Sequence, residues 1–429
     1  MFAGAFLTGA TDRLLPPSVP YRFFVTALAL HAAAWGVLLW GAEDVPSYQG
    51  GLGPVLAALH LVTLGVLAMT ACGAAFQLLP VATGRQLGPL WACRLTWWLL
   101  APGTVALAFG MATGIPPFLR GGASLAVAGL CCALAVLART LAGVTTLPGV
   151  VRHAWVALAG LAGLMVLGLA LVVDFQTGWL PDHGAAALAH GVLGAYGFMG
   201  NLALGFSYVL VPMFVLGRPV PDAIGKRTAA LAALALALGV AAILAGRGEV
   251  AALAGLVGLA AVAEHLRALR TAIKSRMKKR LETFFRLLVP AWAMLPASLL
   301  AGVALALGAP SEKLAPLWGL LLVFGWLLSF VTGIIQRIMP FLASMHSSIT
   351  GGKPALLSGL TAGPPLLVHA VAHGLALPLV AAGILADRIL LVRLGAASGL
   401  IGALALIVFA AELARRYRAH RLANPPPAN

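Results

Sequence analysis

The chain has 429 residues, of which 61% are apolar and only 9% are charged, and its formal net charge is +16. Several apolar stretches exceed the roughly eighteen residues that cross a bilayer, and a soluble fold could not cover this much apolar surface. The composition therefore excludes a soluble globular protein and predicts an all-α polytopic membrane protein. The 50 glycines agree with this class, because small residues let membrane helices pack closely.

The hydropathy pattern predicts about twelve transmembrane helices in a single domain that covers residues 1–429. The spans are 22–41, 52–80, 89–112, 122–144, 154–173, 185–214, 227–246, 250–268, 284–308, 314–341, 355–380 and 388–413. The first span is expected to be retained, because the residues before it lack the pattern of a cleavable signal peptide. Residues 422–429 are expected to form a disordered tail.

The basic residues predict the orientation of the chain. They gather in alternate loops, with the largest groups in the 267–280 loop and at 415–421. By the positive-inside rule this side is cytoplasmic, which places both termini inside and predicts a bacterial inner membrane protein. We interpret the net charge as topology, and expect the 267–280 loop to contact anionic lipids rather than nucleic acid.

A short phrase ends the second, sixth and tenth spans. It reads GAAFQLLP at 73–80, GFSYVLVP at 205–212 and GIIQRIMP at 333–340. The glycine allows a close helix neighbour, and the proline stops or bends a helix. The spacing between copies leaves room for four membrane helices, so the phrases, near 60–80, 190–212 and 320–340, predict a threefold repeat architecture.

The longer segments HLVTLGVLAMTACGAAFQLLP, HGVLGAYGFMGNLALGFSYVLVP and GWLLSFVTGIIQRIMP resemble subunit I of the haem–copper oxidase superfamily and its small NnrS-like relatives. The resemblance implies twelve helices in three pseudo-symmetric four-helix arcs, with both termini inside. It implies a haem ligand on the second helix, where His60 stands, and a copper ligand on the sixth, which His190 approximately matches. The seventh and tenth spans lack the histidines that the superfamily has there, so we do not expect a standard oxygen-reducing binuclear centre.

Five histidines lie within the predicted spans: His31, His60, His190, His369 and His373. A polar ring in hydrocarbon is costly unless it is paired, liganded or facing a cavity. His369 and His373 share one helix face, and His60 and His373 are expected at one membrane depth. We predict that His60, together with His373 or His369, binds haem b. All five are candidate metal ligands, with copper as the alternative to haem iron.

The remaining candidates are assigned lesser roles. His153, His183, His265, His346 and His420 are expected to be interfacial polar residues. The resemblance implies that Arg388, after the eleventh span, meets haem propionates, and a guanidinium suits carboxylates; the alternative is an ordinary membrane-end anchor. No CxxC or CxxCH motif is present, which excludes covalent haem attachment and a zinc or disulfide framework on motif grounds.

Acidic residues are not clearly placed inside any span, which weighs against a proton pump or a proton-coupled carrier. The sequence therefore predicts a haem b-binding membrane protein for electron transfer, nitric oxide or oxygen handling, or metal stress. If the protein is an enzyme, it is expected to be an oxidoreductase, with a quinol or a cytochrome as electron donor. The alternative is a cofactor-free transporter or channel for a small solute, with Asn201, Gln77 and Gln336 lining its path.

Overall fold

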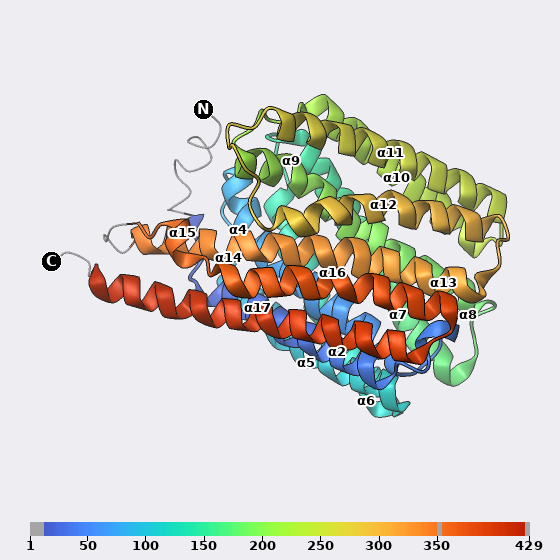
Figure 1. Cartoon of the computed structure of the whole chain (residues 1–429). Coiled ribbons are helices and arrows are strands. Elements are labelled where there is room, and N and C mark those ends of the chain that lie inside the picture. The colour runs from blue at the N-terminus through green and yellow to red at the C-terminus, as the bar shows by residue number, and fades with distance from the viewer. Residues whose placement is uncertain (1–12, 350–353, 425–429) are drawn as a thin grey trace.

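The computed structural model describes residues 13–349 and 354–424. Twelve helices within these ranges are long and apolar enough to cross a membrane, which confirms the predicted all-α class and number of spans (Figure 1). They are α2 (Ser18–Trp40), α3–η3–α4 (Pro54–Thr83), α5 (Leu90–Thr113), α6 (Pro116–Leu141), α7 (Pro148–Thr177), α8–η4–α9 (His183–Val215), α10 (Asp222–Leu244), α11 (Gly248–Lys274), α12 (Phe285–Ala306), α13–η5–α14 (Ser311–Ser347), α16 (Gly363–Ala386) and α17 (Ile389–Ala423).

Two helix boundaries near the C-terminus differ from the prediction. Helix α16 begins at Gly363 rather than near 355, because the short helix α15 (Leu357–Leu360) comes first and two prolines then suit the first turn of α16. Helix α17 continues to Ala423, well past the predicted end at 413. Glu412 pairs with Arg415 and Arg416 along this extension. The first residues of the predicted tail are thus helical, and 425–429 lie outside the described residues.

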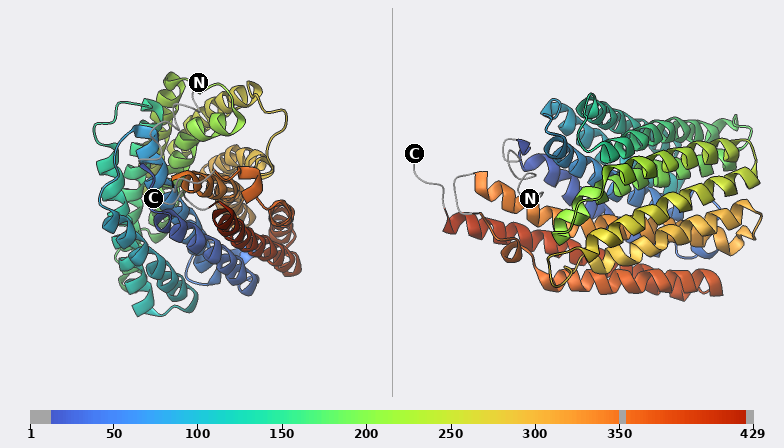
Figure 2. Two further views of the ribbon diagram at one scale, coloured as in Figure 1. Left: turned by 90° about the vertical axis from the view of Figure 1, so that its left-hand side faces the viewer. Right: turned by 90° about the horizontal axis from the view of Figure 1, so that it is seen from above.

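The outer helices form a ring of neighbours. Helix α5 packs on α6, α10 packs on α11, and α16 packs on α17. Helix α17 also packs on α2, and α7 packs on both α6 and α10. Seen along the bundle in the left view of Figure 2, α5–α7 occupy one side, α10–α12 a second side, and α16, α17 and α2 a third.

The second, sixth and tenth spans are the three most buried spans in the described part of the chain. Each contains a π-helical segment, in which hydrogen bonds join residues i and i+5. These segments are η3 (Leu61–Ala68), η4 (Leu193–Gly200) and η5 (Leu320–Leu328), and they contact one another. Each ends five residues before the glycine of its repeated phrase. A second glycine lies at one register inside all three segments: Gly65, Gly197 and Gly325.

The glycine of each phrase faces the helix that precedes its span. A Cβ atom added at Gly73 would lie 2.8 Å from Phe23 Cβ of α2, and one at Gly205 would lie 2.8 Å from His153 Cβ of α7. One added at Gly333 would lie 2.4 Å from a Leu288 methyl of α12. The phrases therefore mark equivalent close helix contacts. Each of the three prolines lacks a backbone N–H donor, yet each helix continues past its proline.

The loops pair across the two ends of the bundle. At the basic end, Arg85 donates to the Gly143 carbonyl and the Arg218 amide donates to Ser275 Oγ. At the other end, Lys313 pairs with Asp387 and Arg393 pairs with Glu43. The start of the first span and the end of the last span both lie at the basic end of the bundle, because the number of spans is even.

The α5–α6 contact yields a matched pair of variants. A Cβ atom at Gly122 would lie 2.2 Å from the Leu107 backbone nitrogen, whereas one at Gly121 would have nothing within 4 Å. We expect Gly122→Ala to lower the free energy of unfolding by about 1–3 kcal/mol and Gly121→Ala to leave it nearly unchanged. Thermal denaturation in detergent, followed by size-exclusion chromatography, measures both. Equal midpoints for the two variants would contradict this packing.

Candidate functional site

The structure separates the five predicted histidines by depth. His60 and His190 lie within two turns of the starts of their spans, Pro54 and His183, at the same end of the bundle. His31, His369 and His373 lie nearer the middles of α2 and α16. The expected equal depth of His60 and His373 is wrong, because α16 begins later than predicted. Among the described residues, no ring contact joins His60 to His369 or His373.

His60 and His190 instead face each other across the second and sixth spans. Their ring centroids lie 6.3 Å apart, and the ring planes are within 19° of parallel. His60 Nδ1 lies 3.0 Å from the Leu56 carbonyl, and His190 Nδ1 lies 2.9 Å from the Leu164 carbonyl. A carbonyl only accepts, so each Nδ1 carries the proton and each Nε2 keeps its lone pair. Such an anchored imidazole is the usual arrangement of a metal-ligating histidine.

The neighbourhood of His190 depends on a glycine of α7. A Cβ atom at Gly168 would lie 3.0 Å from His190 Cε1 and 3.4 Å from Nδ1. A side chain there would press on the imidazole and on its bond to the Leu164 carbonyl. Gly168 thus leaves space for the ring in its observed orientation.

His31, His369 and His373 form a second cluster, from α2 and α16. The ring centroids of His31 and His369 are 6.0 Å apart, and those of His369 and His373 are 5.5 Å apart. All three side chains are buried. Trp35 Nε1 donates to His31 Nε2 at 3.0 Å, and the Trp35 ring lies 6.3 Å from that of His373. Helix α17 closes the cluster, since His369 Nδ1 lies 3.0 Å from the Gly402 carbonyl.

A third cluster joins α7, the sixth span, α10 and α11. His153 Nδ1 lies 2.8 Å from Asn201 Oδ1, and His153 Nε2 lies 3.0 Å from Thr228 Oγ1. The Tyr208 hydroxyl lies 2.8 Å from the same Thr228 oxygen, and its ring lies 5.0 Å from that of His265. This network ties four helices together in the apolar interior.

His153, His265 and His346, which were expected to be interfacial polar residues, are all buried among the helices. Helix α7 begins before the predicted span, and α11 and α14 (Ser329–Ile349) continue past theirs. Polar residues near the ends of these helices therefore lie between helices of the bundle. His183 does lie at a span start, half-exposed, and its Nδ1 is 2.6 Å from Asp174 Oδ2.

Two polar residues occupy the same position in two copies of the repeat, and each forms a hydrogen bond with a histidine of a neighbouring helix. Asn201 and Ser329 each lie four residues before the glycine of their phrase. The Asn201 amide donates to the Tyr196 carbonyl, and the Ser329 hydroxyl is directed at the Phe324 carbonyl, in both cases five residues earlier. Asn201 then bonds His153, and Ser329 Oγ lies 2.7 Å from His373 Nε2. A register comparison of the three phrases would have found these two positions from the sequence.

The other predicted residues fall outside these clusters. Arg388 is exposed in the turn between α16 and α17, and no described hydrogen bond or ring contact joins it to a histidine. Gln77 accepts from the Leu15 amide at 3.1 Å, and His346 Nε2 lies 2.9 Å from the Leu15 carbonyl. Gln77 therefore helps to fasten the segment before α2. Both amide atoms of Gln336 are buried without a hydrogen-bond partner.

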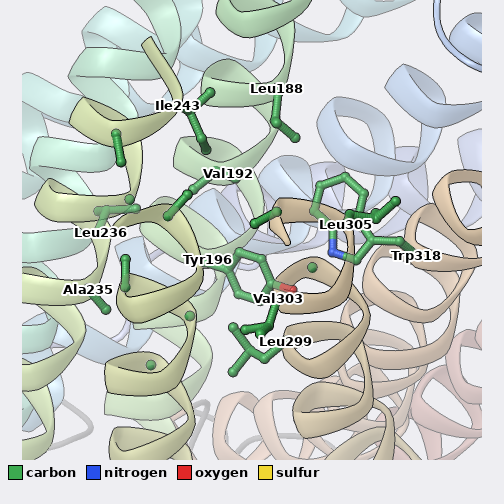
Figure 3. Close-up of a pocket in the computed structure, with 18 of the residues that line it drawn as sticks. Leu188, Val192, Tyr196, Ala235, Leu236, Ile243, Leu299, Val303, Leu305 and Trp318 are labelled. Carbon is green, nitrogen blue, oxygen red and sulfur yellow. The ribbon is translucent and has the colours of Figure 1, made fainter. Parts of the chain in front are cut away.

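A cavity of about 480 Å³ lies between the sixth span and α10–α13 (Ser311–Gly319), as Figure 3 shows. Glycine and alanine make up half of its lining residues. Asp182 and Arg247 stand at the end nearer the acidic loops, and Asn201 lines it deeper in the bundle. Tyr196 points toward it and donates its hydroxyl proton to Ser298 Oγ at 2.9 Å. The small side chains leave this part of the bundle hollow.

Across residues 13–349 and 354–424, no group of three or more His, Cys, Asp or Glu side chains is arranged to hold a metal ion.

No protein-family model and no curated protein matches this chain. The likeness to haem–copper oxidases accordingly rests on the three sequence phrases alone.

The third cluster predicts a stability effect. Replacing His153 with alanine leaves Asn201 and Thr228 without their buried partner and opens a cavity. We expect His153→Ala to lower the free energy of unfolding by about 2–4 kcal/mol. The control is Trp155→Ala, a lipid-facing position on the same helix. Thermal denaturation in detergent measures both, and a His153→Ala midpoint equal to that of the control would argue against a stabilising network.

Proposed function

We propose that this chain is a haem b-binding integral membrane protein of the haem–copper oxidase-like fold. It would serve in electron transfer or in handling nitric oxide, oxygen or metal stress, without a standard oxygen-reducing centre. The single observation that carries the proposal is the pairing of His60 with His190, in place of the predicted pairing with His373 or His369.

The two residues fit an iron ion held by two imidazoles. With metal–nitrogen bonds of about 2.0 Å, the centres of two ligating imidazoles lie about 5 to a little over 6 Å apart, the larger value when the two nitrogens are on opposite sides of the ion. The observed 6.3 Å agrees with facing rings. Both Nδ1 atoms are engaged by backbone carbonyls, so both Nε2 lone pairs remain for the metal. Axial ligation by two histidines is the arrangement of a b-type electron-transfer haem.

The scaffold supports the same proposal. The π-helical segments lie in one register of the second, sixth and tenth spans, and π segments recur at functional sites. His60 directly precedes η3, and His190 lies three residues before η4. We extend the proposal to three pseudo-symmetric arcs around these spans, with both termini in the cytoplasm of a bacterial cell.

The protein residues would perform the binding and the orientation. The Leu56 and Leu164 carbonyls fix the tautomer and the direction of the two rings. The surrounding apolar helices lower the local dielectric, which tunes the potential of a bound metal. Haem held by both histidines would supply one-electron exchange with a quinol or a cytochrome, and gas handling would require one of the two histidines to leave the iron.

The basic loop after α11 is suited to contact with the membrane surface. Arg267, Arg270 and Lys274 are exposed at the end of the helix, and Arg276, Lys279 and Arg280 follow in the loop. Lys278 is paired with Glu282, so only part of the charge is neutralised within the protein. This loop would contact anionic lipid headgroups.

The cavity in Figure 3 favours the second candidate function, a small-solute transporter or channel. Its polar end and apolar walls would suit a small neutral solute. This function requires no cofactor, so a visible spectrum of the purified protein distinguishes it from the haem proposal.

The purified protein is expected to show a Soret band and a sharp α-band in a reduced-minus-oxidised visible spectrum. We expect His60→Ala and His190→Ala each to abolish the α-band, because each removes one of the two axial nitrogens. Gly168→Ala, which presses on the His190 ring, is expected to weaken haem retention about tenfold. Iron content by elemental analysis provides an independent readout.

His183→Ala is the matched control, since it removes a second histidine of α8 that pairs with Asp174. It should leave the spectrum unchanged. A colourless wild-type protein that holds no iron would refute the haem proposal and favour the transporter.

A further inference from the structure

The cluster of His31, His369 and His373 contains three ring nitrogens without hydrogen-bond partners. They are His31 Nδ1, His369 Nε2 and His373 Nδ1. The three side chains are 0–1% exposed, so bulk water does not satisfy these atoms. Three such nitrogens on adjacent rings, whose centroids are 5.5 and 6.0 Å apart, form an arrangement in which buried polar groups commonly share a bound water or ion.

The protonation of each ring follows from its existing partner. Trp35 Nε1 can only donate, so His31 Nε2 holds a lone pair and His31 Nδ1 carries the proton. The Gly402 carbonyl can only accept, so His369 Nδ1 carries the proton and Nε2 holds a lone pair.

We assign the state of His373 from the contacts of Ser329. With the hydroxyl proton on the bond to the Phe324 carbonyl, the Ser329 oxygen accepts from His373 Nε2. His373 Nδ1 then holds a lone pair. The cluster therefore presents two lone pairs on one face of α16 and one N–H donor from α2.

We propose that His369 Nε2 and His373 Nδ1 bind one monovalent copper ion, and that the His31 N–H faces its third coordination position. Imidazole suits copper, and the 5.5 Å between the ring centres falls within the range of about 5 to 6 Å for two imidazoles on one metal. The spacing of four residues on a helix places both rings on one face.

The charge balance favours a monovalent ion. The cluster is lined by Trp35, Phe324, Ser329 and glycines of α17, and none of these is anionic. A buried divalent ion without a carboxylate or thiolate would carry a larger desolvation cost. Copper(I) also accepts two or three ligands, which matches the two lone pairs on offer.

A single water molecule is the competing occupant. It could donate to both lone pairs and accept from His31 Nδ1. One water would leave three imidazoles in the bundle with no function to offset their burial. The two occupants differ in metal content, which an experiment measures directly.

The test is copper retention after loading the detergent-purified protein with copper(I) and passing it over a competing chelator. We expect about one copper per chain in the wild type. His369→Leu and His373→Leu should each lose it. His369→Met and His373→Met should retain it, because a thioether binds copper(I) while Met and Leu fill similar volumes. The methionine variants thus separate lost coordination from lost folding.

Carbon monoxide serves as a probe of the third position. The infrared C–O stretch of the copper(I)–carbonyl complex should shift in His31→Ala, whereas the copper content should stay unchanged. Copper retention that is insensitive to both leucine variants, or a wild type that retains no copper, would overturn the proposal in favour of water.

This site is independent of the proposed haem. His60→Ala is expected to lose the visible spectrum and to keep the copper, so the two proposals fail separately.

Discussion

At the centre of the bundle, η3, η4 and η5 contact one another, and each carries its π-helical turns in the same register. A π turn shifts the hydrogen-bonding partner of a carbonyl by one residue relative to an α-helix. Side chains at the ends of two of these segments, Asn201 and Ser329, bond to carbonyls five residues earlier. The same two side chains bond His153 and His373, so the central contact positions these two histidines.

The histidines of the bundle share one principle of stabilisation. A neutral imidazole among apolar helices has one donor nitrogen and one acceptor nitrogen, and each needs a partner. His153 has partners for both nitrogens and ties four helices together. His60, His190 and His369 instead donate from Nδ1 to a backbone carbonyl, which leaves the other nitrogen as a lone pair. The first pattern pairs both ring nitrogens, and the second leaves one lone pair per ring.

The fold was largely predictable because membrane spans are read from length and hydropathy. The twelve spans agree, and errors concentrate at their ends. Windows of apolar residues end where charges begin, yet α11 and α17 continue as helices through Arg and Lys residues. The late start of α16 reflects Gly363 and its two following prolines. His153, His265 and His346 lie near such helix ends and are buried among the helices.

The sequence by itself determined the class of the protein, its span count, the repeated phrases and the five histidines within spans, because these depend on local composition and spacing. The tertiary structure decided which histidines meet. His60 lies beside His190 rather than His373, since ring contacts depend on helix depth, rotation and crossing, which no single span encodes. The orphaned nitrogens of His31, His369 and His373 likewise emerged only from partners on other helices, Gly402 and Ser329, and from Trp35 one turn away.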